Sequence, residues 1–262
     1  MSRERITSRS NPLIARLRRL KSQRSTRREE GVFLCEGPKM LREALRWDAR
    51  LETVVCTQET DLPDLPVSVR VVEVPKELLA AVADTQTPQG ILTVLEQPVY
   101  DLTQLLEQPD PLFLMLENLQ DPGNLGTMIR TGEGAGITGV IMNNQTVDIF
   151  NPKTIRATMG SIFRVPFVYV PDLAPVLEQM HAKGIHTYAA HLKGQEYYDS
   201  FSFREPTAFL IGNEGNGLSK EISDQAGQYL KIPMEGRVES LNASIAAALL
   251  MYEAHRQRSA RL

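Results

Sequence analysis

The chain has 262 residues, a hydrophobic fraction of 42% and a formal net charge of −3, values that fit one large or two ordinary folded domains with a sizeable core. They exclude a low-complexity or fibrous chain, and the lack of any run of about 18 apolar residues argues against a membrane-spanning helix. The N-terminus lacks an apolar signal core, and the only two cysteines, Cys35 and Cys56, fit a reducing compartment. We therefore expect a cytoplasmic protein with no membrane partner.

The net charge hides a basic N-terminal segment. Residues 1–30 carry ten Lys or Arg against three Glu, although the chain as a whole is acidic. Such a block indicates a polyanion partner, because neutralisation of phosphates supplies sequence-independent affinity for nucleic acid. Leu13, Leu17 and Leu20 recur at helical spacing among the arginines, so a solvated helix face is the alternative. The segment holds no aromatic residue and therefore does not predict base stacking.

Beyond the basic segment, short strands alternate with helices up to residue 98. Apolar strands are predicted at 32–37, 53–56, 70–74 and 90–96. Helices are predicted over 38–47 and 75–83, because apolar residues recur there at helical spacing. The alternation predicts a small α/β domain over residues 1–98, and the proline-containing, acidic stretch 99–110 predicts a linker.

From residue 111 the pattern changes to uniformly apolar strands separated by helices. Such strands are typical of a parallel sheet covered on both faces, and they are predicted at 112–116, 139–144, 164–170, 185–190 and 207–212. Helices are predicted between them, at 125–135, 152–160, 173–182 and 218–226, and a last helix follows residue 242. This order predicts an open α/β sheet over residues 111–262.

Two polar loops follow predicted strands of this sheet, DPGN at 121–124 and GNEG at 212–215. The carboxyl ends of parallel strands are where open α/β sheets bind ligands. Glycines in the second loop allow close approach of a ligand to the backbone. A third stretch, KIPMEGRVESLN at 231–242, leads into the last helix, where Ser240 and Asn242 can accept bonds from the first N–H groups.

Two other patterns are weaker. The glycines of GEGAG at 132–136 close a predicted helix and lead into a strand, the reverse of a dinucleotide-binding fingerprint. We interpret them as a helix end and a turn, which argues against a nucleotide-dependent oxidoreductase. His181, His186 and His191 do not share a face and have no cysteine near them, so no metal site is predicted.

Together the three loops resemble the three motifs of the SpoU/TrmH family, within the SPOUT superfamily of RNA ribose 2'-O-methyltransferases. The first motif reads N-x-G-x-x-x-R-T from Asn124 and the second G-N-E-G-x-G-L-S from Gly212. The third reads I-P-M-x-G-x-V-x-S-L-N-x-S from Ile232, and the three occur in the family's order. The resemblance implies a C-terminal SPOUT domain with a deep trefoil knot, S-adenosyl-L-methionine as the cofactor and no metal.

The resemblance also implies roles for individual residues. The catalytic candidates are Asn124, Arg130, Glu214, Ser240 and Asn242. The cofactor-binding candidates are Gly212, Asn213, Gly217, Ile232, Met234 and Leu241. The family assigns deprotonation of the ribose hydroxyl to Arg130. Because arginine is effectively always protonated, we interpret its role as clamping a phosphate and stabilising the alkoxide.

In this family the additional N-terminal domain resembles ribosomal proteins that bind RNA, and FLCEGPKMLREAL at 33–45 is similar to that domain. The candidate RNA contacts are Arg9, Arg16, Arg19, Arg24 and Arg156. A purely structural role for the helix that carries Arg156 is the alternative for that residue.

The resemblance favours 23S-type large-subunit rRNA as the substrate, with tRNA as the main alternative. A non-catalytic RNA-binding protein of the same fold and a SPOUT enzyme that methylates a base nitrogen are further alternatives. The resemblance also implies a homodimer. The apolar stretch Ile245–Tyr252 of the last helix is interpreted as either its interface or part of the core.

Overall fold

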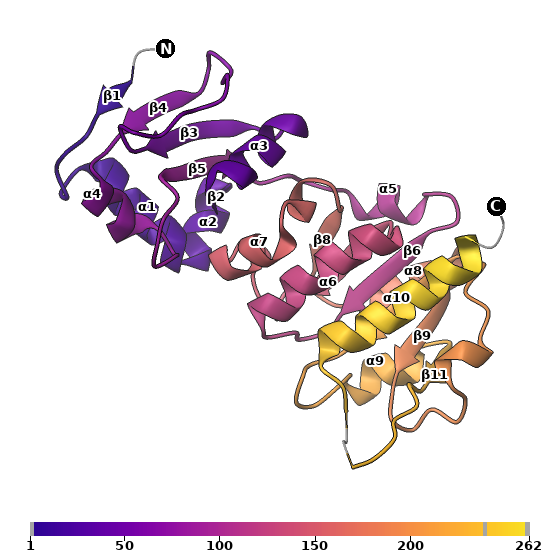
Figure 1. Ribbon diagram of the computed structural model, residues 1–262. Coiled ribbons are helices and arrows are strands. Elements are labelled where there is room, and N and C mark those ends of the chain that lie inside the picture. The colour runs from indigo at the N-terminus through magenta and orange to yellow at the C-terminus, as the bar shows by residue number, and fades with distance from the viewer. Residues whose placement is uncertain (1–2, 238–239, 260–262) are drawn as a thin grey trace. The chain divides into compact units, whose positions relative to one another are not determined.

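The computed structural model describes residues 3–237 and 240–259, which form two compact units (Figure 1). The first unit contains the residues up to Pro98 and the segment Asp148–Arg164. The second contains Val99–Val147 and the residues from Val165 onward. No helix among the described residues is long and apolar enough to cross a membrane.

The first unit is built on a mixed sheet. Its strands lie in the spatial order β1 (Glu4–Arg5), β4 (Arg70–Glu73), β3 (Leu51–Cys56), β5 (Ile91–Glu96) and β2 (Val32–Glu36). The pairs β1–β4 and β3–β4 are parallel, and β5 runs antiparallel to both of its neighbours. The predicted strands of this region are confirmed. β1 was not predicted, because two residues are too few to show a strand pattern.

Helices cover both faces of this sheet. On one face, α1 (Pro12–Ser22) and α4 (Lys76–Val82) share a core with β2 and β5. On the other face, α3 (Pro38–Arg46) buries Leu41 against β3 and β5. The helical spacing of Leu13, Leu17 and Leu20 corresponds to α1 alone, because the backbone is extended at Gln23 (φ −116°, ψ 115°) and a separate helix, α2 (Arg24–Glu30), follows.

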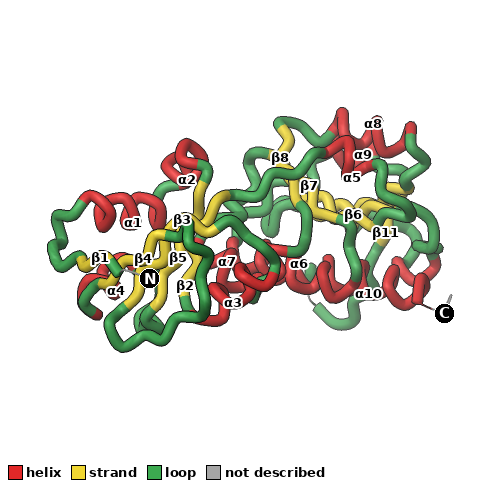
Figure 2. The backbone as a smooth tube through the Cα atoms, turned by 90° about the horizontal axis from the view of Figure 1, so that it is seen from above, coloured by secondary structure: helices red, strands yellow, loops and turns green. Residues whose placement is uncertain are grey.

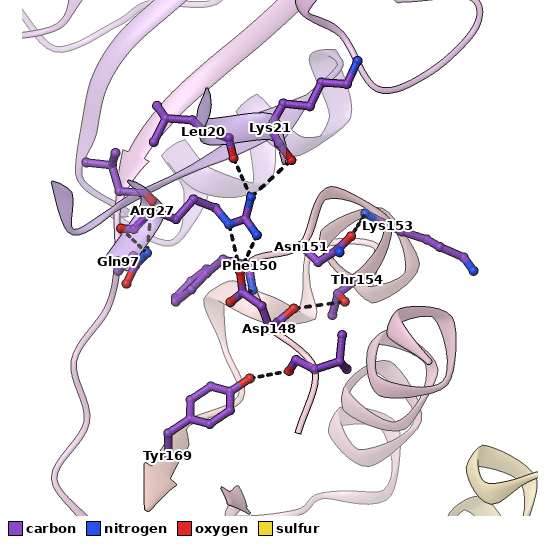
Figure 3. A network of polar contacts seen from close by, with 12 residues as sticks. Leu20, Lys21, Arg27, Gln97, Asp148, Phe150, Asn151, Lys153, Thr154 and Tyr169 are labelled. Carbon is purple, nitrogen blue, oxygen red and sulfur yellow. Dashed lines mark hydrogen bonds and ion pairs between the residues drawn. The ribbon is translucent and has the colours of Figure 1, made fainter. Parts of the chain in front are cut away.

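The segment 148–164, which contains α7 (Pro152–Thr158), is fastened to the first unit by a buried ion pair. Arg27 is 3% exposed and donates from Nε and Nη2 to Oδ2 of Asp148 at 2.8 and 2.6 Å (Figure 3). Its Nη1 donates to the carbonyl of Leu20 at 2.6 Å. The rings of Phe33 and Phe150 also pack together, with centroids 4.7 Å apart. A segment distant in sequence therefore completes the core of this unit.

The second unit is an open parallel sheet, as predicted. Its strands lie in the order β11 (Gln228–Leu230), β9 (His186–Ala190), β10 (Thr207–Ile211), β6 (Leu112–Leu116), β7 (Gly139–Asn143) and β8 (Phe167–Val170), and all of its pairs are parallel. The short edge strand β11 was not predicted. A helix, α5 (Leu102–Leu106), lies within the stretch 99–110, and its Leu105 and Leu106 are buried in the core of this unit.

Two layers of helices enclose the parallel sheet. α6 (Pro122–Ala135) and α10 (Ala243–Ser259) lie on one face, and α5, α8 (Ala174–Ala182) and α9 (Lys220–Gln225) lie on the other (Figure 2). The glycines at 132–136 end α6, with Gly136 in the left-handed region at φ 78°, which confirms the predicted helix end.

The face of α10 expected to be apolar lies outside the core. Ile245, Leu249 and Tyr252 are 51%, 37% and 48% exposed. The buried face instead carries three alanines and two longer apolar side chains, namely Ala243, Ala247, Ala254, Leu250 and Met251. The interpretation of Ile245–Tyr252 as a core stripe is therefore wrong within one chain. The reason is that α10 is apolar on two sides, and α6 packs against the side that carries the alanines.

Candidate active site

A cavity of about 330 Å³ lies at the carboxyl ends of β9 and β10. Its walls come from the segment after β9, the loop after β10 and the stretch that leads into α10. All the predicted cofactor-binding residues line it: Gly212, Asn213, Gly217, Ile232, Met234 and Leu241. The volume falls in the range of small-molecule pockets, about 300–1,000 Å³.

The loop after β10 is folded tightly on itself. The backbone groups of Asn213 and Gly217 exchange two hydrogen bonds of 3.0 and 2.8 Å, and Oδ1 of Asn213 accepts from the N–H of Gly215 at 2.9 Å. A Cβ on Gly212 would lie 2.1 Å from the backbone carbon of Gly217, so this close approach requires glycine. The glycine pattern of the second motif therefore shapes the wall of the cavity.

Glu214 ties this loop to the first motif. Its Oε2 accepts from the N–H of Gln120 at 3.1 Å, and its Oε1 accepts from the N–H of Asp121 at 3.0 Å and from Nδ2 of Asn124 at 3.1 Å. Burial by itself would raise the pKa of Glu214, but these donors outweigh it and lower the pKa below its ordinary value. The side chain is therefore a carboxylate at neutral pH, able to accept from all three donors.

Asn124 also connects to the third motif. Its Oδ1 accepts from Nδ2 of Asn242 at 3.0 Å, while Oδ1 of Asn242 accepts from the N–H of Ser244 at 2.8 Å and so caps α10. Three of the predicted catalytic residues, Asn124, Glu214 and Asn242, thus form one hydrogen-bonded chain across the three motifs.

The other two predicted catalytic residues stand apart from this chain. Ser240 is exposed and lines the cavity. Arg130 is exposed on α6 and has no hydrogen bond or ion pair to any residue within 3–237 or 240–259. Its guanidinium is therefore available to a ligand.

Asn118 is a site residue that the sequence analysis did not single out. It lies between β6 and the first motif in the left-handed region, at φ 55°. Its N–H donates to Oδ1 of Asn143 at 3.0 Å, its Oδ1 accepts from Nδ2 of Asn143 at 2.9 Å, and its carbonyl accepts from Nδ2 of Asn213 at 2.9 Å. An asparagine two residues after the predicted strand 112–116 was the available signal, because this residue tolerates left-handed backbone.

His191 is a second such residue, weighed in the sequence only as a metal ligand. It lines the cavity, its ring stacks on Tyr229 with centroids 5.0 Å apart, and its Nδ1 accepts from the N–H of Lys193 at 3.0 Å. No group of three or more His, Cys, Asp or Glu side chains in the described part of the chain could hold a metal ion.

The candidate RNA contacts fall into two groups in the first unit. Arg9, Arg19 and Arg24 are exposed. Arg16 is held by Glu30 and Glu52 at 2.6 and 2.5 Å, contacts that raise its pKa, and Arg156 is paired with Asp84. The second group is thus engaged by carboxylates of the protein itself.

Comparisons with known proteins agree with this geometry. The family model of the SpoU rRNA Methylase family matches residues 111–252, and the MRM3-like substrate binding domain matches residues 11–93. The 23S rRNA (guanosine(2553)-2'-O)-methyltransferase RlmP of Bacillus subtilis (strain 168) is 34% identical over 86% of this chain and 89% of RlmP. An AdoMet-bound rRNA methyltransferase from Sinorhizobium meliloti has a TM-score of 0.87 and 32% identity over 97% of each chain. The SpoU methyltransferase AviRb from Streptomyces viridochromogenes, in complex with AdoMet, has a TM-score of 0.88 and 28% identity over 95% of this chain and 98% of AviRb.

Proposed function

Because this chain belongs to the SpoU rRNA methylase family, we propose that it transfers a methyl group from S-adenosyl-L-methionine to a ribose 2'-hydroxyl of 23S-type large-subunit rRNA. The observation that carries the proposal is the hydrogen-bonded chain Glu214–Asn124–Asn242 beside the cavity. It joins all three motifs in one site. RlmP, which acts on 23S rRNA, supports the choice of substrate.

The cavity suits the proposed cofactor, which supplies a methyl group activated on a sulfonium when bound. Its lining combines apolar side chains with the exposed polar backbone of the loop after β10. Ile232 and Leu241 are half-buried and would pack on the adenine ring, while the loop from Gly212 to Gly217 would bind polar groups of the cofactor through its backbone. Glycine at 212 lets the loop close on Gly217 and Leu218, and this closed loop forms that wall of the cavity.

The protein's own contribution to the reaction would be positioning and charge stabilisation. A ribose hydroxyl is a poor nucleophile, so the site must hold it in line with the methyl group and stabilise the alkoxide that develops. Arg130 would clamp the adjacent phosphate and stabilise that charge. Asn124, held from both sides by Glu214 and Asn242, would orient the ribose, and Ser240 would contact ribose or cofactor from the cavity wall.

The first unit would bind the RNA. We assign residues 1–98 as the RNA-binding domain, 99–110 as the connection and 111–262 as the methyltransferase domain, whose trefoil knot stays a prediction. Arg9, Arg19 and Arg24 would contact phosphates. Arg16 and Arg156 would contribute less, because releasing them from Glu52 and Asp84 has a cost. Such an enzyme would work in the cytoplasm, where its RNA is.

The direct test is tritium transfer from labelled S-adenosyl-L-methionine to ribosomal RNA and, separately, to bulk transfer RNA. The product is digested and its nucleosides are identified. Label in 2'-O-methyl nucleosides of rRNA is the expected result. Label only in tRNA would mean that tRNA, and not rRNA, is the substrate. Label on bases would overturn the ribose chemistry. Cofactor binding without transfer to rRNA or its assembly intermediates would favour a non-catalytic RNA-binding protein.

Asn118 gives the first prediction for this site. Replacing Asn118 with alanine removes the acceptor Oδ1 for Nδ2 of the buried Asn143, keeps the backbone N–H bond to Asn143, and places alanine at φ 55°, where asparagine is better tolerated. We expect affinity for S-adenosyl-L-methionine to fall by about 5- to 150-fold, since an unsatisfied buried polar group costs about 1–3 kcal/mol. Calorimetric titration measures it. Asn118→Gly relieves the backbone and isolates the loss of the side chain; equal affinity in all three proteins would contradict this role.

The exposed stripe of α10 gives the second prediction. We propose that the enzyme is a homodimer and that Ile245, Leu249 and Tyr252, which follow each other at helical spacing, lie in its interface. Replacing Leu249 with glutamate should raise the dimer dissociation constant at least about tenfold, because a carboxylate would be buried unpaired. Sedimentation equilibrium measures it. Val99, which is 93% exposed in the same unit, provides the control Val99→Glu; a monomeric and fully active wild type would contradict the proposal.

A further inference from the structure

The chain's single tryptophan, Trp47, lies at the C-terminal end of α3 in the first unit and is 47% exposed. Tryptophan is usually largely buried, so an exposed one is informative. The guanidinium carbon of Arg164 lies 5.4 Å from the centroid of the Trp47 ring, within cation–π range. The ring is therefore backed by a cation while about half of the residue faces solvent.

The cation is fixed in place by the surrounding structure. Nη1 of Arg164 donates to Oε2 of Glu43 at 2.5 Å, and the two side chains are only 18% and 22% exposed. Gly160 packs beside Glu43 at φ 103°, where an added Cβ would lie 3.0 Å from Cγ of Glu43. The segment 148–164 thus delivers Arg164 to α3 in a defined position. Arg164 does not depend on a ligand to be ordered.

The exposed face of α3 is basic. Lys39, Arg42 and Arg46 recur at helical spacing, are exposed, and have no hydrogen bond or ion pair within the part of the chain that the structure describes. The carboxylate between them, Glu43, is already engaged by Arg164. Of the neighbouring residues, Asp48 adds one exposed negative charge, so the surface stays positive.

We propose that this surface, defined by Trp47, Arg164, Lys39, Arg42 and Arg46, stacks an unpaired nucleobase of the RNA on Trp47 and binds the flanking phosphates. The inference rests on the proposed function, because it takes RNA as the substrate. An aromatic platform among cations is the arrangement that binds single-stranded nucleic acid. It supplies the aromatic contact that the basic N-terminal segment lacks.

A protein partner fits this surface less well. Protein interfaces are centred on contiguous apolar side chains, whereas the exposed face of α3 carries cations around its one aromatic ring. Their guanidinium and ammonium groups match phosphates, and the indole matches a base. A single-stranded RNA carries both groups and can therefore occupy the whole surface. Self-association of the protein through this surface is an alternative that the experiment below distinguishes.

Because Trp47 is the only tryptophan, tryptophan emission excited selectively over that of the seven tyrosines reports on this surface alone. The wild type is titrated with an unstructured ten-nucleotide RNA. It is also titrated with a fully paired hairpin, each arm of which has ten nucleotides. We expect the single strand, which can donate a base, to quench the emission and the hairpin to quench it much less. Binding is followed independently by the anisotropy of labelled RNA.

Substitution then measures the contribution of the ring. Trp47→Ala should weaken binding of the single strand roughly 5- to 150-fold, since a base–aromatic stack is worth that much on alanine substitution, and Trp47→Phe should recover part of the loss. The control Lys76→Gln removes a cation of the same unit whose side chain is 68% exposed and paired with Glu59. Cofactor affinity should be unchanged in all three variants, because neither Trp47 nor Lys76 lines the cavity.

The outcomes separate this inference from the proposed function. If the wild type methylates rRNA and Trp47→Ala binds and methylates it equally well, the stacking site is wrong and the proposed function stands. Emission that changes with protein concentration and not with RNA would identify a protein–protein surface and overturn the site. If the wild type neither binds nor methylates any RNA, the proposed function fails and the inference fails with it.

Discussion

Replacing Arg130 with alanine is expected to lower the turnover number of methyl transfer at least about 10²- to 10³-fold, the usual cost of removing one preorganised charge stabiliser. Arg130 is exposed on α6 and makes no bond to the protein's described residues, so nothing in the fold depends on it. Its guanidinium is therefore available to a ligand. Because it does not line the cavity, affinity for S-adenosyl-L-methionine should stay within about twofold.

Two further variants sharpen this result. Arg130→Lys keeps the charge but not the bidentate fork that matches a phosphate, so it should recover only part of the turnover. Arg204→Ala removes an exposed arginine of the same unit that does not line the cavity, and it should leave turnover unchanged. Single-turnover kinetics at saturating cofactor measure all three. An Arg130→Ala enzyme with wild-type turnover would remove Arg130 from the mechanism.

The sequence predicted the cavity because its features are local. Closely spaced glycines indicate a tight turn from the sequence alone. Gly212 and Gly217 are where the loop after β10 closes on itself. Asn242 caps the last helix through a bond to Ser244, a pattern set within three residues. The uniformly apolar strands predicted a parallel sheet for a similar reason, since each strand carries its own burial pattern.

Contacts between distant residues could not be predicted in the same way. Nothing near Trp47 in the sequence indicates that Arg164 will lie over its ring, and nothing near Arg27 indicates Asp148. The two apolar sides of α10 were also indistinguishable by periodicity. Their roles depend on the approach of α6, where Gly132 leaves room against Met251. The apolar pattern of α10 is therefore compatible with burial of either face of the helix.

Replacing Arg27 with methionine is expected to destabilise the first unit by about 3–5 kcal/mol, the cost of breaking a buried ion pair from one side. The change removes both donors to Oδ2 of Asp148, whose side chain is 11% exposed, and the donor to the carbonyl of Leu20 at the end of α1. The remaining carboxylate would have lost its guanidinium partner. Urea unfolding followed by the fluorescence of Trp47 measures this unit selectively, since the only tryptophan lies in it.

The exposed pair Arg50–Glu96 is the matched control, with side chains 83% and 54% exposed at 3.4 Å. Arg50→Met should change the free energy of unfolding by at most about 1 kcal/mol, because solvent screens such a pair. In the double variant Arg27→Met, Asp148→Asn the buried charge is gone as well, so part of the lost stability should return. If Arg27→Met costs no more than Arg50→Met, the ion pair does not hold the segment 148–164, and the aromatic contact of Phe33 with Phe150 must carry that role.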